Sequence, residues 1–307
     1  MSEKMLKIVL GVVGALAVVY IATAALGSGG GAPADGSAAG RELAKILASI
    51  DEAGVEAVRF LTPEDTVELR REGSGWSAGG YPADSGLVAS FWAAVEDAAV
   101  GDLVATNPAN HERLGVAGEN PRAIEFVLAG GKSTRLLVGH GGPTYPSAYV
   151  RLPDRNEVHL LRANLRTALD RSLDGWRDRT IVRVDTAAVR RIEVERDGER
   201  YTLARDTAGW MLDGGAANAR AVQGILGELA NLQAVSFAPD SARPAEPNRR
   251  VTALGEAGDT LATVSIGEGD GVYLLATTPG KTTVFELAAW RVDRLVPTRA
   301  EVEPEDR

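Results

Sequence analysis

The pattern of hydrophobic and polar positions divides the chain into three kinds of sequence. From Ile8 to Leu26 no residue is charged, and this run is long enough for a helix that covers a hydrocarbon core of roughly 30 Å. Residues 27–40 are mostly Gly, Ala and Ser, a composition that predicts a flexible linker. From residue 41 onward, alternating stretches and stretches with helical periodicity follow one another, as expected for a folded body.

The uncharged run predicts an N-terminal transmembrane anchor within residues 1–26, with the span at residues 8–26. A cleaved signal peptide is the alternative, because Lys4 and Lys7 precede the run and Ala22-Thr23-Ala24 resembles a cleavage site. The positive charges before the run predict a cytoplasmic N-terminus. We therefore expect a single-pass protein of the bacterial inner membrane with its body in the periplasm.

The body contains an internal repeat. Residues 69–76 and residues 203–210 share the pattern Leu-x-Arg-acid-x-x-Gly-Trp, 134 positions apart. At the same offset, each copy continues with apolar residues at i, i+3, i+4 and i+7, the spacing of one helix face. These residues are Val88, Phe91, Trp92 and Val95 in the first copy and Val222, Ile225, Leu226 and Leu229 in the second.

Strands are predicted around each helix. A hairpin is expected at Asp197-Gly198, because this dipeptide tolerates the positive φ of tight turns. Further strands are expected at 58–60, 67–71, 123–128, 134–138, 158–161, 192–195, 201–205, 250–254, 260–266 and 283–287, and residues 106–121 are expected to be a surface loop. The expected fold class is α+β: an N-terminal transmembrane helix followed by two tandem copies, residues 41–185 and 186–307, of a mostly antiparallel sheet covered by an amphipathic helix.

Composition narrows the possible functions. The net charge of −9 argues against nucleic acid, since phosphate binding depends on clustered Lys and Arg. The absence of cysteine excludes disulfides, thiolate metal sites and cysteine nucleophiles.

Several segments resemble the domain-of-unknown-function 4340 family over about residues 45–300. The resemblance rests on the order and spacing of Gly75-Trp76, Gly80 to Asp84, Thr106-Asn107-Pro108, Arg113 to Val116, Leu136 to Gly139, Ala148 to Arg151 and Trp176 to Thr180. It implies a membrane-anchored bacterial envelope protein that accompanies ABC-type transport systems of the gliding-motility kind. It implies no enzyme activity and no established site residues.

The residues themselves suggest little chemistry. His111, His140 and His159 lack the short spacing of zinc ligands. Gly130 to Thr134 resembles the end of a phosphate-binding loop, but the predicted strands on both sides favour a hairpin turn. The Gly139–Pro146 loop, with Tyr145, is interpreted as a long turn or as the rim of a ligand site.

The tryptophans have two interpretations. Trp76 and Trp210 are expected to fill the space between sheet and helix, and stacking on a sugar is the alternative. We assign no catalytic, cofactor-binding or metal-binding residues and expect no cofactor.

The leading hypothesis is a non-enzymatic accessory module that binds an envelope protein such as an ABC transporter permease. The alternatives are a module that binds a glycan or small ligand and, less favoured, a hydrolase with dispersed carboxylates.

Overall fold

The computed structural model describes residues 37–207, 209–239, 242, 246–269, 273–281 and 283–304. The chain divides into two compact units, the first ending at Trp176 and the second beginning at Arg177. Residues 177–185, which the predicted boundary assigned to the first copy, therefore belong to the second unit, where they contribute strand β10 (Thr180–Val182).

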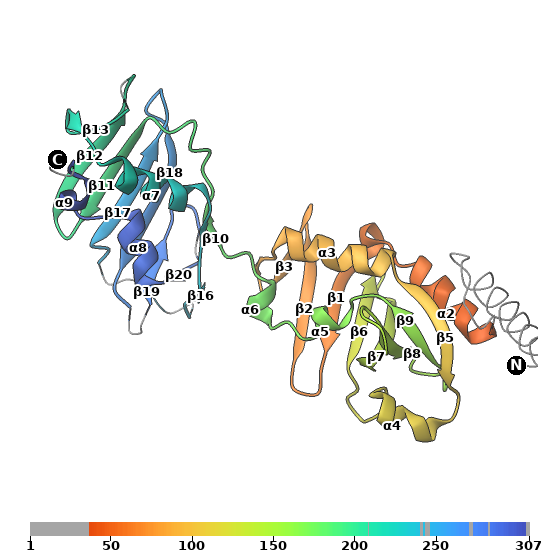
Figure 1. Ribbon diagram of the computed structural model, residues 1–307. Coiled ribbons are helices and arrows are strands. Elements are labelled where there is room, and N and C mark those ends of the chain that lie inside the picture. Colours follow the sequence, from red (N-terminus) through yellow and green to blue (C-terminus); the bar gives the residue numbers. More distant parts are fainter. Residues whose placement is uncertain are drawn as a thin grey trace, which may run out of the picture. The chain divides into compact units, whose positions relative to one another are not determined.

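The first unit is a nine-stranded antiparallel sheet accompanied by helices (Figure 1). Its strand order is β4-β3-β2-β1-β6-β7-β8-β9-β5. Its elements are α2 (Ala38–Ala48), η1 (Glu52–Gly54), β1 (Val55–Leu61), β2 (Thr66–Glu72), β3 (Gly75–Ala78), β4 (Tyr81–Pro82), α3 (Ser85–Glu96), β5 (Ala99–Ala105), η2 (Pro108–Asn110), α4 (His111–Leu114), β6 (Ala123–Leu128), β7 (Ser133–Gly141), β8 (Ala148–Arg151), β9 (Val158–Arg162), α5 (Arg166–Leu169) and α6 (Leu173–Trp176).

The second unit repeats this topology in its own nine-stranded sheet, ordered β14-β13-β12-β11-β17-β18-β19-β20-β16. A separate two-stranded sheet pairs β10 with β15. The remaining elements are β11 (Arg191–Arg196), β12 (Glu199–Arg205), β13 (Trp210–Leu212), β14 (Gly215–Ala216), α7 (Ala219–Ala230), β15 (Leu232–Gln233), β16 (Ser236–Phe237), β17 (Arg249–Leu254), β18 (Thr260–Gly267), β19 (Leu274–Thr277), β20 (Phe285–Leu287), α8 (Ala289–Leu295) and α9 (Arg299–Val302).

Local sequence explains the hairpins and the long helices. Asp197 and Gly198 have φ values of 52° and 88°, the backbone of a tight hairpin turn, which confirms the hairpin predicted there. Helices α3 and α7 begin after Asp84 and Asn218, whose side chains accept hydrogen bonds from first-turn amides.

The core of each unit lies between its sheet and its long helix. Helix α3 buries all four residues of its predicted face, against a cluster of aromatic rings. Helix α7 buries Val222, Ile225 and Leu229, whereas Leu226 is only partly buried. The rings packed in the first unit are Phe60, Trp76, Phe91, Trp92, Phe126 and Trp176.

The loop predicted at residues 106–121 is partly a packed element. Leu114 and Val116 are buried together with Ala105 and Val158 in a small cluster of their own. The chain approaches strand β7 closely there, since a Cβ on Gly139 would lie 2.1 Å from the carbonyl oxygen of Leu114. Glycine at position 139 is therefore required for this packing.

The structure corrects the expected fold class and location. Two large antiparallel sheets dominate and helices are few. Of the helices in the described ranges, none combines the length and the apolar character needed to cross a membrane. The predicted span at residues 8–26 lies outside the described residues, so the structure gives no support to a single-pass inner-membrane protein.

The predicted linker is also corrected at its end. Residues 38–40 form the first turn of α2, with Ser37 as the N-cap and Gly40 buried. The reason is packing, because Leu43 and Leu47 of this helix join the core of the first unit.

Candidate functional site

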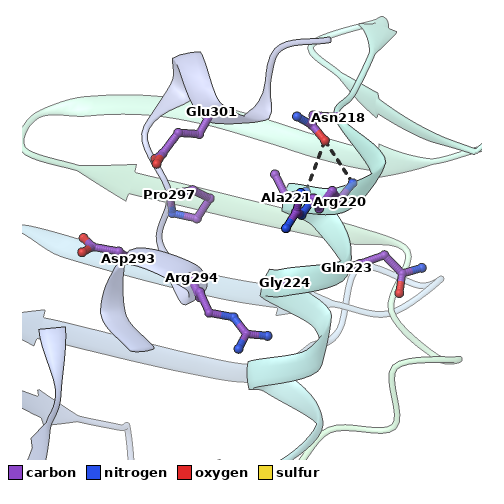
Figure 2. Close-up of a pocket in the computed structure, with 9 residues that line it drawn as sticks. All are labelled: Asn218, Arg220, Ala221, Gln223, Gly224, Asp293, Arg294, Pro297 and Glu301. Carbon is purple, nitrogen blue, oxygen red and sulfur yellow. Dashed lines mark hydrogen bonds between the residues drawn. The ribbon is translucent and has the colours of Figure 1, made fainter. Parts of the chain in front are cut away.

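A hollow in the second unit lies between helix α7 and the α8–α9 segment (Figure 2). Its volume is about 610 Å³. The lining combines polar, charged and small residues: Asn218, Arg220, Ala221, Gln223, Gly224, Asp293, Arg294, Pro297 and Glu301. We call it the α7–α9 hollow.

The N-terminus of α7 forms one end of this hollow. The Asn218 side chain accepts hydrogen bonds from the backbone amides of Arg220 and Ala221, at 3.0 and 3.4 Å. The Asn218 amide donates to the carbonyl oxygen of Val302 at 2.8 Å. The cap residue therefore joins α7 to the end of α9.

The opposite wall is held by a capping box at α9. One carboxylate oxygen of Glu301 accepts from the Thr298 backbone amide at 2.7 Å and from its hydroxyl at 2.8 Å. These backbone and side-chain hydrogen bonds from Thr298 lower the pKa of Glu301. Glu301 is therefore held ionised.

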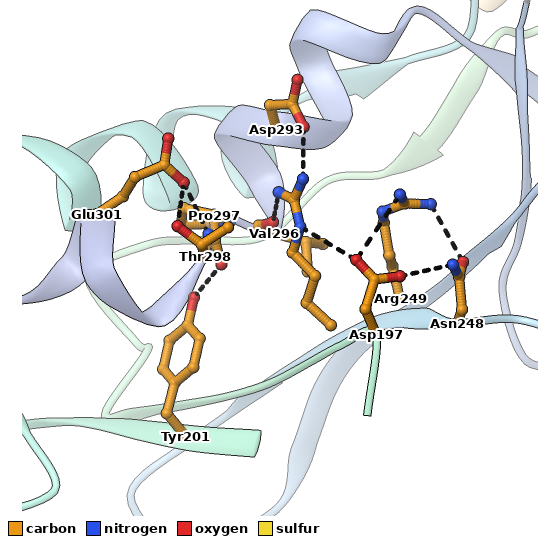
Figure 3. A network of polar contacts seen from close by, with 10 residues as sticks. Asp197, Tyr201, Asn248, Arg249, Asp293, Val296, Pro297, Thr298 and Glu301 are labelled. Atoms are coloured by element: carbon orange, nitrogen blue, oxygen red, sulfur yellow. Dashed lines mark hydrogen bonds and ion pairs between the residues drawn. The ribbon is translucent and has the colours of Figure 1, made fainter. Parts of the chain in front are cut away.

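A polar network connects this wall to the sheet (Figure 3). Arg196 donates to the carbonyl oxygen of Val296 at 2.6 Å and to the carboxylate of Asp293 at 3.0 Å. The Tyr201 hydroxyl donates to the carbonyl oxygen of Pro297 at 2.7 Å. Because these donors come from strands β11 and β12, the turn after α8 has a fixed position over the sheet.

A buried carboxylate links α7 to α8. Glu228 is 5% exposed and pairs with Arg291 at 3.1 Å and with Arg294 at 3.6 Å. Arg294 also lines the hollow, so the ion pair fixes one of its walls.

This arrangement suits binding better than proton transfer. Both lining carboxylates already have structural partners, and the pKa of Glu301 is lowered, whereas a general acid needs a raised one. Arg220 and Gln223, by contrast, are exposed and face solvent. They are the groups available to a ligand or partner.

Comparison with known proteins places the chain in a family. The family described as Domain of unknown function (DUF4340) matches residues 76–253, more than half of the chain. The chain belongs to the DUF4340 family. No curated protein and no solved structure matches it.

The match of the DUF4340 family begins at Trp76 and ends in strand β17, so it includes parts of both units. This confirms the resemblance carried by the sequence motifs. The family description assigns no activity, and the chemistry must therefore be judged from the residues.

The three histidines of this DUF4340 protein occupy separate elements. His111 begins α4 and its Nε2 lies 2.9 Å from the carbonyl oxygen of Asn156. His140 is exposed on β7, and His159 is buried on β9. Within the described ranges, no three His, Cys, Asp or Glu side chains are grouped so that they could hold a metal ion.

Two glycine-rich segments contain turns, and the second begins with the last three residues of strand β7. Gly130 and Gly131 have positive φ in the hairpin between β6 and β7, as the flanking strands predicted. The Gly139–Pro146 loop borders a hollow of about 340 Å³ whose lining includes Tyr145, Ser147 and Arg166. Tyr145 is 85% exposed, so the proposed ligand rim is available in the structure.

Sequence reasoning overlooked one motif, Gly75-Trp76-Ser77-Ala78-Gly79, which matches the Gly-x-Ser-x-Gly pattern of serine hydrolases. That pattern functions at a strand-to-helix turn that exposes the serine. Ser77 instead lies on β3, is 3% exposed, and donates to a Glu72 carboxylate oxygen at 2.7 Å. This motif is therefore part of a hairpin and not a nucleophile site.

The two repeated tryptophans differ in exposure. Trp76 is 8% exposed in the core of the first unit, as expected from the sequence. Trp210 is only partly buried and borders a second hollow beside α7, of about 410 Å³. We call it the Trp210 hollow.

The sequence did not reveal the α7–α9 hollow. Its lining residues come from two segments, residues 218–224 and 293–301, which are about seventy positions apart in the sequence. The available signal was local: Asn218 before a helical stretch, and Thr298 three positions before Glu301, which is a capping-box spacing.

Proposed function

We propose that this DUF4340 protein is a non-enzymatic accessory module that binds another protein, and that the partner is a component of an ABC-type transport system. The transport connection rests on the family resemblance alone. The protein-binding role rests on the surface of helix α7.

The observation that carries the proposal is that α7 has a hollow on each side. Gln223 lines both the α7–α9 hollow and the Trp210 hollow, so both border the same exposed residue of the helix. A partner segment that lies across α7 would occupy both.

Two glycines on α7 support this assignment. A helical glycine costs about 1 kcal/mol relative to alanine, so packing usually justifies it. Here a Cβ on Gly224 or Gly227 would meet its nearest neighbour at 3.8 or 3.9 Å, which is ordinary contact. The internal packing does not require either glycine, whereas close approach of a partner backbone would.

Site-specific photo-crosslinking tests the proposal. A benzoyl-phenylalanine at position 223 should crosslink in cells to one protein of an ABC-type system. Position 132, in the exposed turn between β6 and β7, is the control and should not give that product. Equal products at both positions, or none at position 223, would contradict a partner surface on α7.

A second candidate function is binding of a glycan or small ligand at the Tyr145 loop. The exposed ring of Tyr145 on the rim of a hollow favours it, since sugars stack on aromatic faces. Binding to a glycan array that Tyr145→Ala abolishes would support this function, and unchanged binding would remove the loop from consideration.

A further inference from the structure

The turn before the first strand has the same geometry in both units. In the first unit, the Ala53 amide donates to a carboxylate oxygen of Asp51 at 3.2 Å and the Gly54 amide to its carbonyl oxygen at 3.0 Å. In the second unit, Ala187 and Ala188 make the same bonds to Asp185, at 2.9 and 3.0 Å. Glu52 and Thr186 therefore hold equivalent positions.

The facing hairpins have the same register. Arg71 pairs with Trp76 across β2 and β3, and Arg205 pairs with Trp210 across β12 and β13. An arginine and a tryptophan thus face the turn in each unit.

In the first unit these side chains contact the carboxylate of Glu52, whose side chain is 44% exposed. The Trp76 Nε1–H donates to a Glu52 carboxylate oxygen at 2.9 Å. Arg71 donates to the carbonyl oxygens of Val55 and Glu52, and its Nη2 forms an ion pair with the same carboxylate oxygen at 3.8 Å. The Arg71 guanidinium lies over the Trp76 ring, 4.7 Å from its centroid, and Trp92 packs 5.7 Å from it. The indole is consequently buried.

In the second unit the carboxylate is replaced by Thr186, which is shorter and neutral, and Trp92 is replaced by Leu226. The result is the Trp210 hollow, lined by Thr186, Ala187, Arg205, Trp210, Gln223 and Leu226 among others. Within the described part of the chain, the Arg205 and Trp210 side chains make no hydrogen bond or ion pair. The same two donors are present without their acceptor.

We propose that the Trp210 hollow binds a glutamate side chain of the partner polypeptide. The Trp210 Nε1–H and the Arg205 guanidinium bind the carboxylate, as Trp76 and Arg71 bind Glu52, and Leu226 contacts the apolar stem. The assignment rests on the proposed protein-binding function and names the group that α7 and its surroundings recognise.

The charges favour a carboxylate over a phosphate. Among the described residues that line the hollow, Arg205 is the one cation, and Asp185 caps the turn beside it. A dianion would be poorly compensated there, whereas a single negative charge is balanced.

A peptide titration tests the site directly. Acetyl-Leu-Glu-Ala-amide, added to the full chain labelled with ¹⁵N, should shift the indole N–H resonance of Trp210, which Trp210→Phe identifies. The matched acetyl-Leu-Gln-Ala-amide should leave it in place, and Arg205→Gln should abolish the shift. Equal shifts with both peptides would overturn the proposal.

A substitution in the turn provides an independent test. Thr186→Glu supplies the carboxylate from the chain itself, so the Trp210 resonance should move without peptide and no longer respond to it. Thr186→Gln introduces a side chain of the same size as glutamate but without its charge, and the Trp210 resonance should still shift when the peptide is added. A Trp210 resonance unchanged by Thr186→Glu would overturn the equivalence.

The two proposals fail in different ways. If Thr186→Glu leaves the crosslink from position 223 intact and the glutamate peptide does not bind, the carboxylate site is wrong and the partner surface stands. If the peptide binds and position 223 never crosslinks, the glutamate site stands and the α7 partner surface is wrong.

Discussion

The backbone amide of Asp84 donates a hydrogen bond of 2.8 Å to the carbonyl oxygen of Trp176. Asn218 and Val302 make the same 2.8 Å contact in the second unit. In both cases the last residue of the last helix is joined to the cap of the long helix. In each unit, a contact between residues distant in sequence thereby joins the last helix to the start of the long helix.

Trp176 is expected to be the most sensitive core position of the first unit. It is 1% exposed and stacks on Phe60 at 5.0 Å. Trp176→Ala should lower the free energy of unfolding by about 3–5 kcal/mol, because it leaves a cavity. Urea unfolding of the full chain measures this loss. Trp290→Ala is the control, since Trp290 is 54% exposed. An equally large loss of unfolding free energy in Trp290→Ala would contradict the role of Trp176 burial.

Gly139→Ala should displace the loop at residues 106–121. Its Cβ would overlap the carbonyl oxygen of Leu114, so we expect a destabilisation of about 1–3 kcal/mol. Hydrogen exchange should show faster exchange at Leu114 and Val116. Gly75→Ala, which meets no atom within 4 Å, should leave that exchange unchanged. Unaltered exchange in Gly139→Ala would show that the loop does not depend on this approach.

The buried pair of Glu228 and Arg291 should show strong coupling. Arg291→Met leaves the carboxylate with Arg294 alone, and we expect a cost of about 1–3 kcal/mol. The double variant Glu228→Leu/Arg291→Met should recover part of this loss, because no unpaired charge stays buried. A double-mutant cycle from urea unfolding measures the coupling. If the cost of the double variant equalled the sum of the costs of the two single variants, the interaction energy of the pair would be zero.

Tyr201 should make the second unit less stable at alkaline pH. Burial raises the pKa of Tyr201 above its ordinary value of 10.0, so folding favours the neutral phenol. This contribution is fully present below pH 10 and is lost as the pH rises through the folded-state pKa. Tyr201→Phe should cost about 1 kcal/mol at neutral pH, where the hydrogen bond to Pro297 is lost.

The pH dependence of the difference is the decisive measurement. The gap in unfolding free energy between the native chain and Tyr201→Phe should be constant up to pH 10 and narrow above it. Tyr145→Phe, at an exposed ring, should show no such change. If the difference in unfolding free energy instead widened above pH 10, the neutral phenol of Tyr201 would not be the form that folding favours.

Local pattern accounts for the parts of the fold that the sequence predicted. Strand β6 has the predicted bounds of 123–128, and β17 and β18 differ from prediction by one residue at an end. Each lies in a hairpin, where pairing is between sequence neighbours and alternation is visible. The helix face of α3 was equally evident because its period is intrinsic to the helix.

Contacts between distant residues account for what the sequence did not show. The difference between Trp76 and Trp210 depends on Glu52 and Thr186, each about two dozen positions before its tryptophan. The repeated motif made the tryptophans look alike, and only the fold shows which one has a carboxylate beside it. Helix α2 was not predicted for a similar reason, since Leu43 and Leu47 are buried by residues of the first-unit core that are distant in the sequence.

The position of β5 at the sheet edge has a consequence for synthesis of the chain. This strand leaves the ribosome long before its neighbour, because Ala105 pairs with Val158. Until β9 emerges, β5 has no partner strand on either of its edges, and closing such a long loop is slow. The first sheet therefore cannot be completed while the chain is half made, and a nascent chain stalled after β7 would expose a strand edge to chaperones or to aggregation.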